Sequence, residues 1–417
     1  MVILVSLKDN AKLKLKSFFG RVSMQIAIKN IGIIVSGDYN NALLEGDTII
    51  IKDKLIKSVG IVPDDEVFSS DVVINANGAT AIPGLIDSHV HITFGDYTPR
   101  QNTVGYLESY LHGGTTTCIS ASEVHVPGRP KDPEGVKALA IAAKKCFEEY
   151  RPGGMRVLAG SIILEPGLTR DDFIEIKEQG VWLAKAGFGA VNNADEYVGM
   201  VSEAKSSGLF TTLHTGGASI PGSFPITGDD LININPDVAF HINGGPVAIE
   251  DKFFETVAKE TKIAMQVCTA GNLRTTILCA EMAKKYKAFS RFLIATDTPT
   301  GSGIMPLGMI YTISHVASLA GLDPEMVIAS ATGNVAKVYG LNSGFLKTGC
   351  DGDVVIIDAP LGGTKNNALD SLKNGDPCAI GAVISDGMPR FVGRSRNTPP
   401  TTRKIHVERS EIKNIFN

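Results

Sequence analysis

Two histidines, His89 and His91, stand two residues apart at the end of the apolar stretch Ala81–Thr93. Successive side chains of a strand point to opposite faces, so residues two apart share one face. Both imidazoles therefore project the same way from one strand end. A chelating pair needs this arrangement, because two neutral nitrogens must reach one divalent metal at about 2.0–2.1 Å. The spacing predicts a metal-binding pair, and the alternative is two exposed histidines in a loop.

Further ionisable side chains fall in other apolar runs. His214, His241 and Asp297 end three later runs, and Lys185 lies within a fourth. The chain has eight histidines, and chance would not gather four of them at such ends. Each histidine alone could be a core or capping residue. Together, four imidazoles, one carboxylate and a bridging group can hold two divalent metals a few ångströms apart, so the sequence predicts a binuclear metal centre.

Eight apolar, β-branched runs alternate with helical stretches from residue 80 onward. Continuous apolar strands with intervening helices indicate a parallel sheet that is buried on both faces. Eight such units in about 250 residues predict an α/β fold, a (β/α)8 TIM barrel whose chemistry sits at the carboxyl ends of the strands. The runs end near His91, Ser122, Leu164, Ala190, Gly216, Asn243, Ala270 and Asp297.

The connections between these runs have helical character in seven places. Thr169, followed by acids in the first turn, is a favourable helix N-cap. The last helix is expected to be continuous and to end at Gly340. The expected helices cover residues 102–112, 134–150, 169–178, 194–206, 275–286, 307–320 and 324–339.

Short strands with turn signals flank the barrel on both sides. Each flanking module alone is too small to bury a core, so we expect the two to join into one small β-sandwich. The predicted division assigns residues 25–84 and 341–396 to the sandwich and residues 85–340 to the barrel. The polar tail from Ser395 is expected to extend over the surface.

Composition argues against several classes of partner. The net charge is −4, and no basic run is interleaved with aromatic residues, so nothing indicates a nucleic-acid partner. No apolar run is long enough to span a bilayer, and Met1–Leu7 lacks the basic region and cleavage site of a signal peptide. The six cysteines have no C-x-x-C spacing, so we expect buried thiols in a reducing, cytoplasmic setting.

The stretch Pro83–His91, the later strand-end histidines, Asp297 and the split β modules resemble the amidohydrolase superfamily over residues 25 to about 400. Several loop stretches make the resemblance closest to the members that hydrolyse cyclic enamides. Those stretches are residues 95–101, 127–132, 178–182, 214–222, 241–246, 304–308, 331–334 and 395–400.

The resemblance implies a ligand set and a reaction. His89, His91 and Asp297 would hold one metal, and His214 and His241 the other. The metals would be zinc or iron, although an N/O ligand set also admits manganese or cobalt. Asp297 would carry a proton from water to the leaving nitrogen, or act only as a ligand. The implied substrate is a small anionic cyclic amide, 6-oxo-1,4,5,6-tetrahydronicotinate, opened to 2-formylglutarate and ammonia by a homotetramer.

Lys185 is where the chain departs from those members. They bridge their metals with a glutamate from the fourth strand, whereas this chain has no acid there and, after a one-residue gap, places Lys185. Many members of the superfamily instead use a lysine carboxylated by CO2, and a carbamate offers the same two oxygens as glutamate. The reaction needs a neutral amine, which a desolvated site favours. We expect a carbamate on Lys185; an unmodified surface lysine would put the second metal site in doubt.

Arg100, His125 and Arg129 lie in loops after the first two strands and are candidate substrate contacts. Arginine suits bidentate binding of a carboxylate, although a surface salt bridge is the commoner role. Two other functions stay open. One is a cyclic amidohydrolase of the dihydroorotase or hydantoinase kind, and the other is a non-catalytic scaffold of the same fold. The complete ligand set argues against the scaffold.

Overall fold

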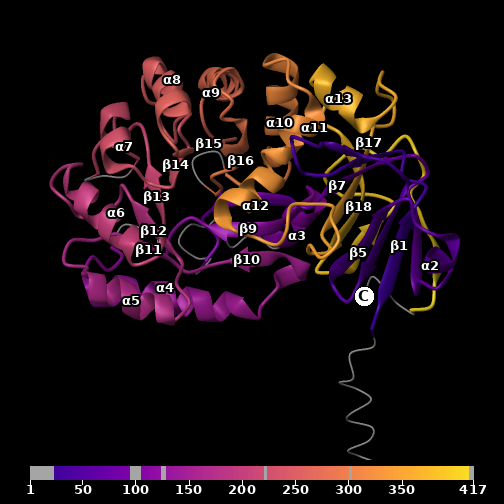
Figure 1. Ribbon diagram of the computed structural model, residues 1–417, viewed down its shortest axis with the longest axis horizontal. Coiled ribbons are helices and arrows are strands. Elements are labelled where there is room, and N and C mark those ends of the chain that lie inside the picture. The colour runs from indigo at the N-terminus through magenta and orange to yellow at the C-terminus, as the bar shows by residue number, and fades with distance from the viewer. Residues whose placement is uncertain (1–22, 94–104, 124–127, 220–222, 300–302, 413–417) are drawn as a thin grey trace, which may run out of the picture.

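The computed structural model describes residues 23–93, 105–123, 128–219, 223–299 and 303–412. A barrel with its helices forms one side of the molecule, and two β-sheets built from both ends of the chain form the other (Figure 1). The α/β barrel predicted from the sequence is confirmed. Among the described residues, no helix is long and apolar enough to cross a membrane.

Parallel strands make up the barrel wall, and the third strand is divided into two short strands. The split falls at Gly160, whose φ is +101°. An isolated bridge between Glu123 and Ile162 joins the two halves of the wall there, and a bridge between Val90 and Thr298 closes the ring. The strands are β8 (Leu85–Val90), β9 (Thr115–Ser120), β10 (Arg156–Leu158), β11 (Ser161–Ile163), β12 (Leu183–Ala186), β13 (Phe210–His214), β14 (Val238–Phe240), β15 (Ala264–Cys268) and β16 (Phe292–Ala295).

Helices cover the outside of the wall, as continuous apolar strands require. The predicted cap is confirmed: the Thr169 side chain accepts a hydrogen bond from the Asp172 amide, and a capping box forms. Two helices that the sequence analysis did not propose, α7 and α8, follow β13 and β14. The helices of this part are α3 (Tyr106–His112), α4 (Pro133–Glu148), α5 (Arg170–Glu178), α6 (Glu196–Ser206), α7 (Gly228–Ile234), α8 (Asp251–Glu260), α9 (Leu273–Lys285) and α10 (Gly308–Leu319), with 3-10 turns at Pro152–Gly154 and Phe289–Arg291.

The expected single helix over residues 324–339 is wrong. The chain forms α11 (Pro324–Ala329) and α12 (Gly333–Tyr339) with a break between them. The break frees two carbonyl groups for the barrel: Ser330 accepts from the Ile294 amide and Ala331 from the Ile86 amide, each at 2.9 Å. The bonds to two strands replace helical bonds that a continuous helix would have made.

The flanking segments form a five-stranded and a six-stranded sheet, in the orders β20-β6-β1-β4-β5 and β19-β18-β17-β7-β2-β3. Buried residues of both sheets belong to one hydrophobic cluster, which includes Ile28, Ile49, Ala81 and Ile356. The strands are β1 (Gln25–Lys29), β2 (Ile33–Val35), β3 (Leu43–Leu44), β4 (Thr48–Lys52), β5 (Leu55–Gly60), β6 (Val72–Asn75), β7 (Thr80–Pro83), β17 (Val354–Asp358), β18 (Ala379–Ser385), β19 (Met388–Val392) and β20 (His406–Ser410); α2 (Asp64–Phe68) and α13 (Ala368–Asn374) are also present.

Two further expectations need correction. The tail does not merely extend over the surface, because β20 pairs antiparallel with β6 and covers an edge that would otherwise expose unpaired backbone groups. The cysteines are all free thiols, but Cys146 is exposed and Cys350 is only half-buried.

Candidate metal centre

A carboxylate and two imidazoles meet at the carboxyl ends of β8 and β16. His89 belongs to β8, His91 follows it, and Asp297 follows β16. The Oδ1 atom of Asp297 lies 3.1 Å from Nε2 of His89 and 3.3 Å from Nε2 of His91. Two donor atoms that share one tetrahedral metal at about 2.0–2.2 Å stand about 3.4 Å apart. Each imidazole therefore lies at the distance from the Asp297 carboxylate that two ligands of one ion would have.

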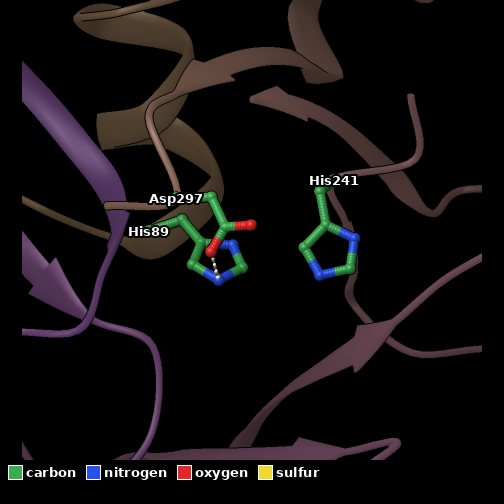
Figure 2. A group of neighbouring side chains, drawn as sticks. All are labelled: His89, His241 and Asp297. Carbon is green, nitrogen blue, oxygen red and sulfur yellow. Dashed lines mark ion pairs between the residues drawn. The ribbon is translucent and has the colours of Figure 1, made fainter. Parts of the chain in front are cut away.

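His241 and His214 form a second group beside the first. One donor atom of His241 lies within 4.8 Å of those of His89 and Asp297, and Figure 2 shows the three side chains around one space. Nδ1 of His214 lies 3.0 Å from Nε2 of His241, and Nε2 of His214 lies 2.8 Å from the Gly217 carbonyl oxygen. Since Nε2 of His214 donates to that carbonyl, Nδ1 of the neutral ring carries a lone pair. The pair fits a second ion next to the first.

Burial keeps the four imidazoles neutral. It lowers the pKa of His91 and of His214 to about 4, and it lowers the pKa of His89 and His241 below the ordinary value. A neutral imidazole is the form that binds a metal. Burial opposes ionisation of Asp297, but its contacts with His89 and His91 outweigh the effect of burial and hold the pKa of Asp297 well below its usual range. At neutral pH the site presents neutral nitrogen donors and one carboxylate.

Lys185 lies on β12 and is fully buried, which does not fit a surface lysine. Its Nζ atom has no hydrogen-bond partner among the described residues and lies 4.8 Å from the ring centre of Phe188 and 5.1 Å from that of Phe240. Burial lowers the pKa of Lys185 to about 8, although the charge of Asp297 opposes the shift. A buried ammonium without a hydrogen-bond acceptor is costly, so this position favours a neutral or modified amine.

A second layer of hydrogen bonds orients His89. Its Nδ1 lies 2.8 Å from Oε1 of Gln266, and Nε2 of Gln266 donates to Oγ of Ser88 at 2.8 Å. Asp87 accepts from the Thr296 amide at 3.0 Å and from the Thr296 hydroxyl at 2.5 Å, which ties β8 to β16. Because Gln266 accepts at Nδ1, Nε2 of His89 is directed to the candidate ion.

Two candidate ligands have backbone conformations that residues other than glycine rarely adopt. The φ angle is +36° at His241 and +60° at Asp297. Such conformations cost about 1–3 kcal/mol each and gather at functional sites. Strain at these strand ends fits side chains that are held for binding.

Replacing Gln266 with leucine should weaken metal binding by about 10- to 100-fold, because the His89 ring loses the acceptor that fixes its orientation. Zinc titration of the metal-free protein against a chromophoric chelator measures the change. The Gln266→Glu variant keeps an acceptor at this position and should stay near the wild-type affinity. If Gln266→Leu binds zinc as tightly as wild type, packing against Phe240, 4.0 Å away between ring centres, would suffice to hold His89.

The structure describes one of the three candidate substrate contacts, Arg129. Arg100 and His125 lie outside the described residues. Arg129 is described and is buried, not exposed at the barrel mouth. Its guanidinium pairs with the carboxylate of Glu165 at 2.5 Å.

Two buried acids at the same end of the barrel, Glu123 and Glu165, were not among the predicted site residues. Glu123 accepts from the Gly160 amide at 2.9 Å and from the Thr93 hydroxyl, and burial raises its pKa to about 7. Each acid comes directly after an apolar run, and this position is the sequence signal that marks both as strand-end residues.

Comparison with known proteins gives one consistent result. The Amidohydrolase family model matches residues 80–222 and 244–396. The chain is 43% identical over 381 residues to an enamidase from Eubacterium barkeri, which covers 91% of this chain and 98% of that protein. It is 24% identical to an adenine deaminase from Bacillus subtilis over 81% of this chain, but that match covers only 55% of the deaminase.

Solved structures agree with the sequence matches. The crystal structure of enamidase superposes with a TM-score of 0.87 at 42% identity and covers 92% of this chain and 100% of that one. A β-aspartyl dipeptidase from Fervidobacterium islandicum AW-1, 20% identical with a TM-score of 0.62 over 91% of this chain and 100% of that one, shares the fold alone. The segments that match the family model include the first and the last strand of the barrel. The enamidase match runs through almost the whole chain. The resemblance read from the motifs is confirmed, and the chain belongs to the amidohydrolase family.

Proposed function

We propose that this protein hydrolyses the C–N bond of a cyclic amide, and that its substrate is 6-oxo-1,4,5,6-tetrahydronicotinate. Water would open the ring to a carboxylate and an enamine, and the enamine would tautomerise to an imine. A second water would hydrolyse the imine to give 2-formylglutarate and ammonia. The observation that carries the proposal is 43% identity to enamidase along 91% of the chain. The cluster of histidines and Asp297 at the strand ends supports it, because such a donor set suits metal-dependent hydrolysis.

The proposed cofactors are two divalent metal ions, zinc or iron, with manganese or cobalt also compatible with the donors. His89, His91 and Asp297 would hold one ion, and His214 and His241 the other. Lys185, carboxylated by CO2, would offer one oxygen to each. Two cations held there would lower the pKa of a bound water towards neutrality and would polarise the scissile carbonyl.

The protein's own residues would then handle the proton. Asp297 directs Oδ1 to His89 and His91, so we assign Oδ2 to take the proton of the attacking water and to deliver it to the leaving nitrogen. The buried aromatic rings of Phe188 and Phe240 surround Lys185 and exclude water from the amine.

The same proposal includes the division of the chain and its assembly. Residues 25–84 and 341–396 would form a small β-sandwich beside the barrel of residues 85–340. The shared hydrophobic cluster of the two sheets supports this division. By similarity we also propose a homo-oligomer, a tetramer, which sedimentation analysis would test.

A substrate panel tests the proposed reaction. Protein loaded with zinc and bicarbonate is incubated with oxo-tetrahydronicotinate, dihydroorotate, hydantoin and adenine, and products are followed by NMR and ammonia release. We expect turnover of the oxo-tetrahydronicotinate. Turnover confined to a dihydropyrimidine or hydantoin would favour the other cyclic amidohydrolases, and a protein that binds no metal would favour the scaffold.

Carboxylation of Lys185 should depend on pH, because CO2 reacts only with the neutral amine. With a pKa of about 8, half of the amines are neutral at pH 8 and about one in a hundred at pH 6. The initial rate of ¹³C-labelled CO2 uptake by the metal-free protein should therefore rise about 50-fold from pH 6 to pH 8 at fixed dissolved CO2. Carbon NMR measures the signal, and the Lys185→Ala protein gives the background. Uptake that does not change over this range would contradict the assignment.

A further inference from the structure

A buried ion pair lies beside the loop that follows β12. The side chains of Arg129 and Glu165 are only 3% and 0% exposed, and Nη1 of the arginine lies 2.5 Å from Oε1 of the glutamate. The pair joins three loops at one end of the barrel, since Arg129 comes after β9, Glu165 after β11, and their further contacts are with the loop after β12. Neither charge is left unpaired, as burial of charge requires.

Both members of the pair hold the backbone of the loop at residues 187–190. Nη2 of Arg129 donates to the Phe188 carbonyl at 2.7 Å, and Oε2 of Glu165 accepts from the Ala190 amide at 2.5 Å. Nη1 of Arg129 also donates to the Pro130 carbonyl at 2.9 Å. The loop is therefore fixed at a carbonyl and at an amide two residues apart. A buried network whose charges are paired and whose members bond to the backbone holds those members rigidly.

This loop packs directly on two candidate metal ligands. The Phe188 ring centre lies 4.8 Å from Nζ of Lys185 and 4.6 Å from the ring centre of His214. Gly187 has a φ of +100°, and a Cβ atom built there would stand 2.5 Å from Cβ of His214. The backbone at Gly187 therefore lies against His214, and the Phe188 ring lies against the Lys185 amine.

We propose that Arg129 and Glu165 are positioning residues that hold residues 187–190 over Lys185 and His214. In this role they fix Lys185 where its carbamate could bridge two metals, and Arg129 is not the contact for the substrate carboxylate that its residue type suggested. The geometry supports this role because the guanidinium is already paired with Glu165 and donates two hydrogen bonds to backbone carbonyls of the chain itself. The inference rests on the proposed function only in taking Lys185 as the bridging group.

Two variants test the proposal through metal binding and a spectroscopic signal. Arg129→Lys keeps the charge but loses the planar fork that reaches Glu165 and Phe188 together. Glu165→Gln keeps the shape and an acceptor but removes the charge. Each protein is dialysed against buffered zinc and ¹³C-bicarbonate, and zinc per chain, the carbamate carbon resonance, kcat and KM are measured.

Arg156→Lys is the matched control. Arg156 also forms a largely buried ion pair, with Asp351, but it opens β10 at the opposite end of the strand from the candidate ligands. We expect both test variants to bind the second zinc about 10- to 100-fold more weakly and to lose the carbamate signal in parallel, with KM little changed in the remaining activity. The control should keep both signals at a comparable loss of thermal stability.

Several outcomes would overturn the inference. Full zinc and carbamate with a raised KM in Arg129→Lys would make Arg129 a substrate contact, and equal losses in Arg156→Lys would reduce the effect to general destabilisation. If Arg129→Lys does not fold, the isosteric Glu165→Gln decides by the same readouts. A wild-type protein without the carbamate signal also refutes the inference. A wild-type protein with two zincs and the signal but no ring opening refutes the proposed function and leaves the positioning role intact.

Discussion

The Asp297→Asn protein is expected to fold and to lose about 10⁴-fold or more in kcat. The size follows from two roles in one side chain. Asp297 places Oδ1 within 3.3 Å of both His89 and His91, so it is a candidate ligand, and it is also proposed to move the proton. General acid–base catalysis alone contributes about 10²- to 10⁴-fold, and an amide can neither accept that proton nor return it. Steady-state assays with saturating zinc, alongside zinc per chain, measure both effects.

A buried acid outside the barrel provides the control for Asp297. Asp358 lies on β17, is fully buried and accepts from the Arg403 amide at 2.7 Å. The Asp358→Asn variant should lower thermal stability and leave kcat unchanged. If Asp297→Asn instead kept two metals and more than about one part in a hundred of wild-type kcat, solvent would carry the proton and Asp297 would be a ligand alone.

Lys185→Ala should reduce the metal content from two ions per chain to one and lower kcat by about 10²- to 10⁴-fold. The second ion loses the only donor assigned to both sites, and a metal supplies several kcal/mol of transition-state stabilisation, each 1.36 kcal/mol being tenfold in rate. The alanine also leaves space where the buried lysine stood. Acetate or propionate that enters this space would offer the two missing oxygens, so we expect partial recovery of zinc binding and of kcat with added carboxylate.

Lys137→Ala separates loss of the bridge from loss of any buried lysine. The Lys137 side chain is 8% exposed and its Nζ lies 2.7 Å from Asp172 and 2.9 Å from Glu175, on the outer helices. This variant should lose stability and keep both metals. One zinc per chain in wild type, unchanged by Lys185→Ala, would mean that Lys185 is not a bridge and that the chemistry depends on a single ion.

Local sequence signals were enough for the barrel and for the residues that end its strands. The two-residue period of a strand puts His89 and His91 on one face, and parallel strands bring their carboxyl ends to one end of a barrel, whatever the loops do. His214, His241 and Asp297 could therefore be expected near them. The cap at Thr169 was equally predictable, because it depends on residues three apart.

Other features depend on partners that local patterns do not reveal. The helix expected over residues 324–339 breaks because Ser330 and Ala331 bond to barrel strands far away in the chain. The tail forms β20 because β6 offers it an open edge. In both cases the competing hydrogen bonds come from segments that lie far apart in the sequence. The local pattern of apolar and polar residues does not indicate such partners.

The sequence by itself determined which residues end the barrel strands, since the apolar pattern that marks a strand depends on neighbours within a few positions. Only the tertiary structure decided how Lys185 and Arg129 are used. Burial between Phe188 and Phe240 lowers the pKa of Lys185, and the partner of Arg129 is Glu165, in a loop of a different strand. The residue type gives a side chain its charge, but the dielectric around that charge and the group that neutralises it are set by chain folding.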